Sequence, residues 1–186
     1  MNFRGPLLTE LRSKGHEVIA CAPDGNLFLP EDRVQTWLHD MGIIYHSIPL
    51  QRTGMNPLRD VKSFLYLRDL FIKETPDIVC SYTIKPVIYG SLAAYWAQVP
   101  RIYSIITGLG YTFMGETLKR RAINYLTQHL YRRALKYNNR VFFQNPDDLN
   151  LFLELNLVSQ RQVCQINGSG VDVEYFKDVD FLQGPP

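Results

Sequence analysis

The sequence has little of what would mark a membrane-spanning or nucleic-acid-binding protein. No apolar run approaches the ~20 residues that a helix needs to cross a bilayer. The formal net charge of the 186 residues is only +2, which excludes the strong basic field typical of nucleic-acid-binding domains. Charges at Glu10, Arg12 and Lys14 are not typical of a signal peptide. A composition with 46% hydrophobic and 20% charged residues indicates instead an ordinary globular domain with a sizeable core.

Cysteine is also scarce, and its spacing is uninformative for metal binding. Cys21, Cys80 and Cys164 lie far apart, each within a strand-like segment. The sequence contains no Cys-x-x-Cys or His-x-x-x-His spacing, so it predicts no metal site. A reactive thiol is the alternative to the simpler interpretation, in which all three are small buried side chains in a reducing compartment. We therefore expect a cytoplasmic protein.

Strand and helix patterns alternate along nearly the whole chain, which favours an α/β fold: a Rossmann-like parallel sheet with helices on both faces. The expected helices cover residues 6–14, 31–41, 57–73, 86–98, 117–137 and 146–155, and the expected strands cover residues 16–22, 43–50, 77–82, 101–106, 140–144 and 162–166.

Both ends of the sequence are unusual for such a domain. A doubly wound domain opens with a strand, whereas residues 1–5 run directly into a helix. We therefore expect the first, central strand of the sheet to be missing, which would leave unpaired ladders on both sides and an open slot in the core. Residues 181–186 are typical of a linker. We interpret the chain as part of a longer one.

Two short stretches follow successive expected strands, the position at which open α/β sheets bind ligands. Thr83, Lys85 and Ser91 lie near the start of a helix, whose unpaired N–H groups favour anions. In Thr107-Gly108-Leu109-Gly110, the glycines allow backbone N–H groups to approach a ligand closely. These residues suit a phosphate- or sugar-binding crevice, and plain turns with an exposed lysine are the alternative. The glycine loop lacks the third glycine and the strand-end acid of a dinucleotide site.

Three further segments carry groups that could act on a ligand. Asn2, Arg4 and Gly5 precede the first helix, where Arg4 could pair with a phosphate and a frayed terminus is the alternative. Residues 167–172 form a glycine-rich turn, for which a structural connector is favoured. The helix over residues 117–137 carries many basic residues beside an apolar stripe. This pattern occurs in helices that rest on anionic membranes and in core-facing helices with a solvated side, and we favour the second.

Taken together, these segments resemble the N-terminal domain of a GT-B glycosyltransferase of family four. The likeness is to the branch that builds capsular polysaccharide, O-antigen or other lipid-linked glycans. It rests on Asn2-Phe3-Arg4-Gly5-Pro6-Leu7, Lys14-Gly15-His16-Glu17-Val18, Tyr82-Thr83-Ile84-Lys85-Pro86, Thr107-Gly108-Leu109-Gly110-Tyr111, and Asn167-Gly168-Ser169-Gly170-Val171-Asp172 with Phe176.

The resemblance implies a two-domain enzyme. Residues 1–175 would form the Rossmann-like acceptor-binding domain, and residues 176–186 would begin the linker to a missing C-terminal donor domain. The implied reaction transfers a sugar from a nucleotide-sugar to a saccharide on undecaprenyl diphosphate, in bacterial surface polysaccharide biosynthesis. The donor is then a substrate, and neither a cofactor nor a metal is expected. The implied partners are the nucleotide-sugar, the lipid-linked acceptor and, through peripheral contact, the inner face of the plasma membrane, with no role for nucleic acid.

The resemblance also implies roles for individual residues. Asn2, Arg4 and Gly5 would line the cleft near the donor phosphates, and Thr83 and Lys85 would face the acceptor or its diphosphate. Thr107, Gly108 and Gly110 would lie beside the transferred sugar. Some family members carry a histidine where this chain has Thr107 or Gly108, so no catalytic residue is assigned.

We expect the isolated chain to be inactive and poorly stable. The alternatives are a non-catalytic module that binds a sugar or nucleotide, and an inactive gene fragment. A nucleotide-sugar epimerase would need acids and a histidine in the cleft, which the sequence does not offer.

Overall fold

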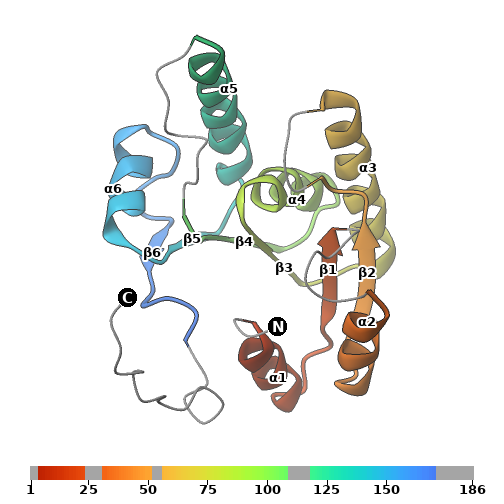
Figure 1. Cartoon of the computed structure of the whole chain (residues 1–186). Coiled ribbons are helices and arrows are strands. Elements are labelled where there is room, and N and C mark those ends of the chain that lie inside the picture. Colours follow the sequence, from red (N-terminus) through yellow and green to blue (C-terminus); the bar gives the residue numbers. More distant parts are fainter. Residues whose placement is uncertain (1–3, 24–30, 52–55, 109–117, 171–186) are drawn as a thin grey trace, which may run out of the picture.

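The computed structural model describes residues 4–23, 31–51, 56–108 and 118–170, which form an α/β fold (Figure 1). The helices of this part are α1 (Gly5–Ser13), α2 (Glu31–Asp40), α3 (Pro57–Glu74), α4 (Ile84–Trp96), α5 (Leu118–Leu135) and α6 (Pro146–Glu154). The strands are β1 (Ile19–Pro23), β2 (Ile44–Ile48), β3 (Ile78–Tyr82), β4 (Arg101–Ile106), β5 (Arg140–Phe143) and β6 (Val163–Gln165). Every element that the sequence predicts is confirmed, with ends shifted by a few residues.

The strands form two parallel sheets within the described residues, one of order β1-β2 and one of order β3-β4-β5-β6. Ile19 of β1 lies opposite Ile44, and Ile78 of β3 lies opposite Arg101. All pairs are parallel because a helix separates each strand from the next. Within this described part β1 and β3 share no ladder, so each pairs along one side only. A missing strand between them stays a prediction.

Capping residues that can be recognised in the sequence define several helix ends. Asn56 and Asn145 precede prolines at the starts of α3 and α6, and their side-chain oxygens accept from the backbone N–H of Arg59 at 3.3 Å and Asp148 at 2.8 Å. Gly42, two residues after the end of α2, has φ of +68°, the left-handed conformation in which glycine has no steric penalty.

The main core lies between the four-stranded sheet and the helices α4, α5 and α6, and α4 is flanked by α3 and α5 (Figure 1). Its fully buried side chains include Val87, Ile106, Tyr131, Val141, Phe143 and Phe152. A polar chain crosses this core: the Ser91 and Ser104 hydroxyls lie 3.2 Å apart, and Ser104 donates to Asn138 Oδ1 at 2.7 Å. The prediction that Ser91 lies at a ligand crevice is therefore wrong, because two turns of helix carry it past the strand ends and against β4.

The prediction that the cysteines are buried is wrong for Cys21 and Cys80, which are exposed, whereas Cys164 is half-buried. Cys80 lies on β3 between Val79, which packs in a cluster with Ala94 of α4, and Ser81, which contacts Gly90 of α4. Since side chains alternate along a strand, Cys80 points to the opposite face, away from α4.

Candidate functional site

The parallel strands end along one edge of the larger sheet, and this carboxyl edge gathers several of the residues that the sequence singles out. Thr83 follows β3, and Thr107 and Gly108 follow β4; all three are exposed. Open α/β sheets bind ligands outside this edge. The structure thus brings the two predicted stretches together. Asn2 and Gly110, which the same predictions include, lie outside the described residues.

Thr83 adopts an unusual backbone conformation at this edge. Its φ of +67° lies in a region that non-glycine residues rarely adopt, and its hydroxyl makes no capping hydrogen bond to α4 within the described structure. The helix begins at Ile84, two residues before the predicted start at Pro86. Proline fits there because first-turn residues have no helical acceptor for an N–H. The N-terminus of α4 therefore opens directly onto the carboxyl edge, beside an available hydroxyl.

Lys85 is held in a buried ion pair. Its Nζ lies 2.8 Å from Asp60 Oδ1 in the first turn of α3, and the two side chains are only 15% and 10% exposed. The Tyr89 hydroxyl also hydrogen-bonds to Asp60. Burial, followed by the Asp60 charge, raises the pKa of Tyr89 above its ordinary value. Asp60 thus compensates the charge of Lys85, which the sequence analysis treats as a free cation. No spacing in the sequence relates Asp60 to Lys85.

Arg4 provides a second cation at the same edge. Its guanidinium carbon lies 3.9 Å from the centroid of the Tyr82 ring, at the end of β3. Desolvation lowers the pKa of Arg4 from its ordinary value, and desolvation raises the pKa of Tyr82 to about 12. Within the described part of the chain, no ion pair joins Arg4 to a carboxylate. Among the described residues, Arg4 therefore places a positive charge without a carboxylate partner against Tyr82, the residue that precedes Thr83.

Gly5, the neighbour of Arg4, has a packing role. It is buried, and a Cβ on it would lie 3.6 Å from the indole of Trp37 on α2. At that distance a Cβ would make an ordinary contact, so Gly5 packs the start of α1 against α2 without this packing requiring a glycine. The structure offers no direct test of the prediction that Gly5 contacts a ligand.

The glycine-rich turn after β6 returns to the end of β5. Gln144 directly follows β5, and its Nε2 donates to Ser169 Oγ at 2.8 Å. Gly168 and Gly170 flank Ser169 with φ of +90° and +72°. Gln144 belongs to no motif in the sequence, although its place after a buried strand matches that of Thr83 and Thr107.

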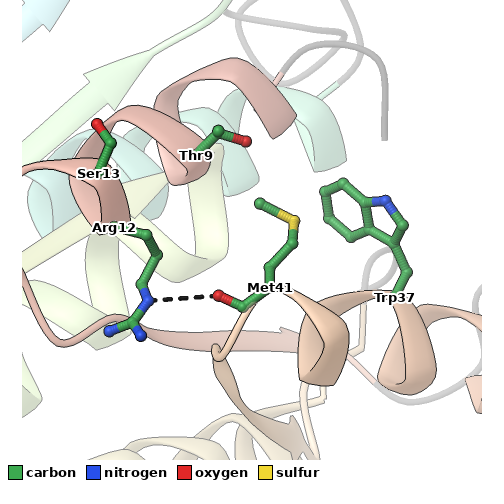
Figure 2. A pocket seen from close by; sticks show the side chains of 5 residues that line it. All are labelled: Thr9, Arg12, Ser13, Trp37 and Met41. Carbon is green, nitrogen blue, oxygen red and sulfur yellow. Dashed lines mark hydrogen bonds between the residues drawn. The ribbon is translucent and has the colours of Figure 1, made fainter.

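A surface hollow between α1 and α2 is lined by Thr9, Arg12, Ser13, Trp37 and Met41 (Figure 2). Its arginine is engaged: Arg12 Nε donates to the Met41 carbonyl at 3.3 Å, and another guanidinium nitrogen donates to the His16 carbonyl at 3.0 Å. These bonds tie α2 to the end of α1. The hollow therefore joins two helices and offers no free cation for a ligand.

The chemistry available at the carboxyl edge is that of anion and sugar binding. Arg4 supplies charge, and the helix starts of α1 and α4 supply unpaired N–H groups. Thr83 and Thr107 supply hydroxyls. The described residues hold no group of three metal-binding side chains.

Curated relatives match most of this chain. It is 25% identical over 175 residues to N,N'-diacetylbacillosaminyl-diphospho-undecaprenol alpha-1,3-N-acetylgalactosaminyltransferase of Campylobacter jejuni, covering 94% of this chain and 44% of the relative. It is 27% identical over 153 residues to UDP-Gal:alpha-D-GlcNAc-diphosphoundecaprenol alpha-1,3-galactosyltransferase of Escherichia coli, covering 82% of this chain and 38% of the relative. The chain thus spans less than half the length of these two relatives.

The fold is also found in a solved structure. MurG of Acinetobacter baumannii superposes with a TM-score of 0.55 at 15% identity, over 90% of this chain and 41% of MurG. At that identity the likeness shows the fold alone, a Rossmann-like domain of the GT-B type. The model of the glycosyl transferase 4-like domain family matches residues 5–168. The fold agrees with the family match, and the chain belongs to the glycosyl transferase 4-like domain family.

Proposed function

We propose that this chain is the acceptor-binding part of a glycosyltransferase that moves a sugar from a nucleotide-sugar to a saccharide on a lipid diphosphate. The single observation that carries the proposal is the Arg4 guanidinium at 3.9 Å from the ring of Tyr82, two residues before α4 begins, with no carboxylate partner among the described residues. A diphosphate needs such a cation together with unpaired N–H groups. Two relatives are named for acceptors on diphospho-undecaprenol, which supports this substrate class.

In the proposed reaction this half of the enzyme acts by positioning. Arg4 and the α4 N-terminus hold a diphosphate, while Thr83, Thr107 and Gly108 face the sugar. Because Lys85 is already paired with Asp60, its role is to fix the start of α4 against α3 and so orient Thr83. Rate enhancement then comes from orientation and electrostatic stabilisation of the leaving group, without a covalent intermediate on this domain.

The proposed domain arrangement extends beyond the described residues. Residues 1–175 form the acceptor domain and residues 176–186 begin the linker to a donor domain. The relatives, which are more than twice as long as their matched parts, support this division.

No helix among the described residues is long and apolar enough to cross a membrane. We place the enzyme in the cytoplasm, peripherally on the inner face of the plasma membrane, where a lipid-linked acceptor lies.

Steady-state transfer by the intact protein tests this function. The assay supplies a nucleotide-sugar and a prenyl-diphosphate saccharide, and compares Arg4→Ala with Arg33→Ala, which removes an exposed arginine from α2. A lost hydrogen bond to a charged group is worth roughly 1.5–3 kcal/mol, so we expect kcat/KM to fall at least about tenfold for Arg4→Ala and to stay unchanged for Arg33→Ala.

The two Michaelis constants distinguish the two sources of diphosphate. A rise in KM for the acceptor alone assigns Arg4 to the lipid diphosphate, as the proposal requires, whereas a rise for the donor alone would assign Arg4 to the nucleotide and contradict that part of the proposal. Binding of both substrates without transfer would favour the non-catalytic module instead. Equal kinetics for Arg4→Ala and the unaltered protein would contradict the assigned role of this edge.

A further inference from the structure

Gln144 is a polar residue of the carboxyl edge that has no part in the proposed function. It directly follows β5, and its Nε2 donates to Ser169 Oγ at 2.8 Å. Ser169 belongs to the glycine-rich turn after β6, which has no part in that function either. Within the described part of the chain, no hydrogen bond reaches the side-chain carbonyl oxygen of Gln144. The turn thus holds the carboxamide and leaves one acceptor and one N–H for another group.

The strand register places Gln144 beside Thr107. Ile106 of β4 lies opposite Phe143 of β5 in the parallel ladder. Thr107 and Gln144 are the next residues along these two strands, so they leave the sheet side by side, about 5 Å apart. The turn that carries Ser169 follows β6, the neighbour of β5 on its other side. Three neutral polar side chains therefore form a row along this end of the carboxyl edge.

The row belongs to the same face of the sheet as Arg4. The residues before Thr107 and Gln144 pack in the main core beside α4. Because side chains alternate along a strand, Thr107 and Gln144 belong to the opposite face. Tyr82 belongs to that face too, since the residue before it contacts α4. Arg4 covers the Tyr82 ring there, and α1 lies on the side of the strands away from α4 (Figure 1).

Apolar side chains lie next to this row on the same face. Ile105 precedes Thr107 by two residues, and Phe142 precedes Gln144 by two, so each pair shares the face. Ile105 and Phe142 lie opposite each other in the ladder, and both are half-buried. A carboxamide beside a partly open apolar pair is complementary to a group that combines an amide with a methyl.

We propose that Gln144 recognises a 2-acetamido group on the sugar next to the lipid diphosphate. The free carbonyl and N–H of Gln144 match the N–H and carbonyl of an acetamido group, and its methyl packs on Ile105 and Phe142. A single hydroxyl oxygen matches that pair of groups poorly. Arg4 on β3 and Gln144 on β5 are two strands apart, roughly 10 Å, a span that one hexose ring with its substituents covers. Ser169 acts as a positioning residue. The inference rests on the proposed function, which supplies the diphosphate-linked acceptor.

Calorimetric titration of the intact protein with two matched acceptors tests the proposal. The probes are N-acetylglucosamine and glucose, each on the same short-chain prenyl diphosphate, so they differ only at one substituent. We expect the acetamido probe to bind at least about tenfold more tightly, the net worth of two hydrogen bonds. Equal affinity for the two probes would overturn the proposal.

Gln144→Leu keeps the approximate size of the side chain and removes both polar atoms. It should remove most of the acetamido preference, and Ser169→Ala should lower the preference in part because it frees the carboxamide. Gln160→Leu is the matched control, since Gln160 is an exposed glutamine in the segment before β6, at the opposite end of that strand. Its preference should equal that of the unaltered protein. A preference that survives Gln144→Leu, or an equal weakening of both probes by this change, would contradict recognition by Gln144.

Arg4→Ala separates this proposal from the proposed function. It should weaken both probes by the same factor and leave their ratio unchanged, because both carry the diphosphate. If Arg4→Ala changes neither affinity while the preference still depends on Gln144, the diphosphate role fails and acetamido recognition stands. If Arg4→Ala weakens both probes and no preference exists, the reverse holds. Absence of binding by either probe would overturn both.

Discussion

Replacing Lys85 by methionine removes the positive charge from the ion pair while keeping an unbranched apolar side chain. Asp60, only 10% exposed, would then lose its partner and keep a hydrogen bond from Tyr89. Breaking one side of a buried pair costs about 3–5 kcal/mol. We expect about 3 kcal/mol here, the lower end, because both side chains keep some access to solvent. For a domain of this length that corresponds to a fall in melting temperature of roughly 6–12 °C.

The double-mutant cycle separates this charge effect from simple packing. Asp60→Asn leaves Lys85 unpaired, while Asp60→Asn with Lys85→Met leaves no charge at the site. We expect the double variant to lose about 2 kcal/mol less free energy of unfolding than the two single variants lose together. Urea denaturation of the intact protein measures these free energies. Additive losses would refute the account of Lys85 as a residue neutralised by Asp60. If Lys85 were instead a free, ligand-binding residue, Lys85→Met would leave stability unchanged and lower the affinity for the acceptor.

Two substitutions and the pH dependence of stability give three further expectations for the intact protein. A Cβ on Gly90 would lie 2.5 Å from Ser81 Oγ and 3.6 Å from its Cβ, so Gly90→Ala should cost about 1–3 kcal/mol in urea denaturation; Ser81→Ala in the same chain should remove most of that loss. Asn138→Ala removes two buried hydrogen bonds, one to Ser104 and one to the Ala134 carbonyl, and should lower the free energy of unfolding by about 2–3 kcal/mol. A loss smaller than the error of the urea titration would contradict a stabilising role for these bonds. Desolvation raises the pKa of Tyr82 to about 12 and raises that of Tyr131 as well. The folded state therefore favours the neutral phenols, and this stability should be fully present below pH ~10, the ordinary tyrosine value, and lost as pH rises through about 12. A melting temperature constant across that range would contradict it.

The order of the helices and strands could be predicted because the local signals are strong. Pro57 and Pro146 follow capping asparagines, and Gly42 ends a helix with a positive φ. Such signals act within a few residues and need no knowledge of the rest of the fold. The start of α4 is an exception, since Pro86 marks its first turn and not its first residue.

The candidate site could be predicted only in outline. Placing Thr83 and Thr107 on one edge follows from parallel topology alone. The pairing of Lys85 with Asp60 could not be foreseen, because it joins residues of two helices that tertiary packing brings together. The burial of Ser91 and the position of Arg4 over Tyr82 have the same origin. Helical spacing places the apolar stripe on α5 only in part. Leu130 and Ala134 pack in the core, whereas Leu126 is 45% exposed.

The most direct test of the central claim is calorimetric titration of the intact protein with a saccharide on a short-chain prenyl diphosphate, compared with the same saccharide lacking the diphosphate. The account predicts that the diphosphate strengthens binding at least about tenfold, the worth of one hydrogen bond to a charged group, and that Arg4→Ala removes most of this difference. Equal affinity for the two saccharides, or a diphosphate preference that survives Arg4→Ala unchanged, would contradict it.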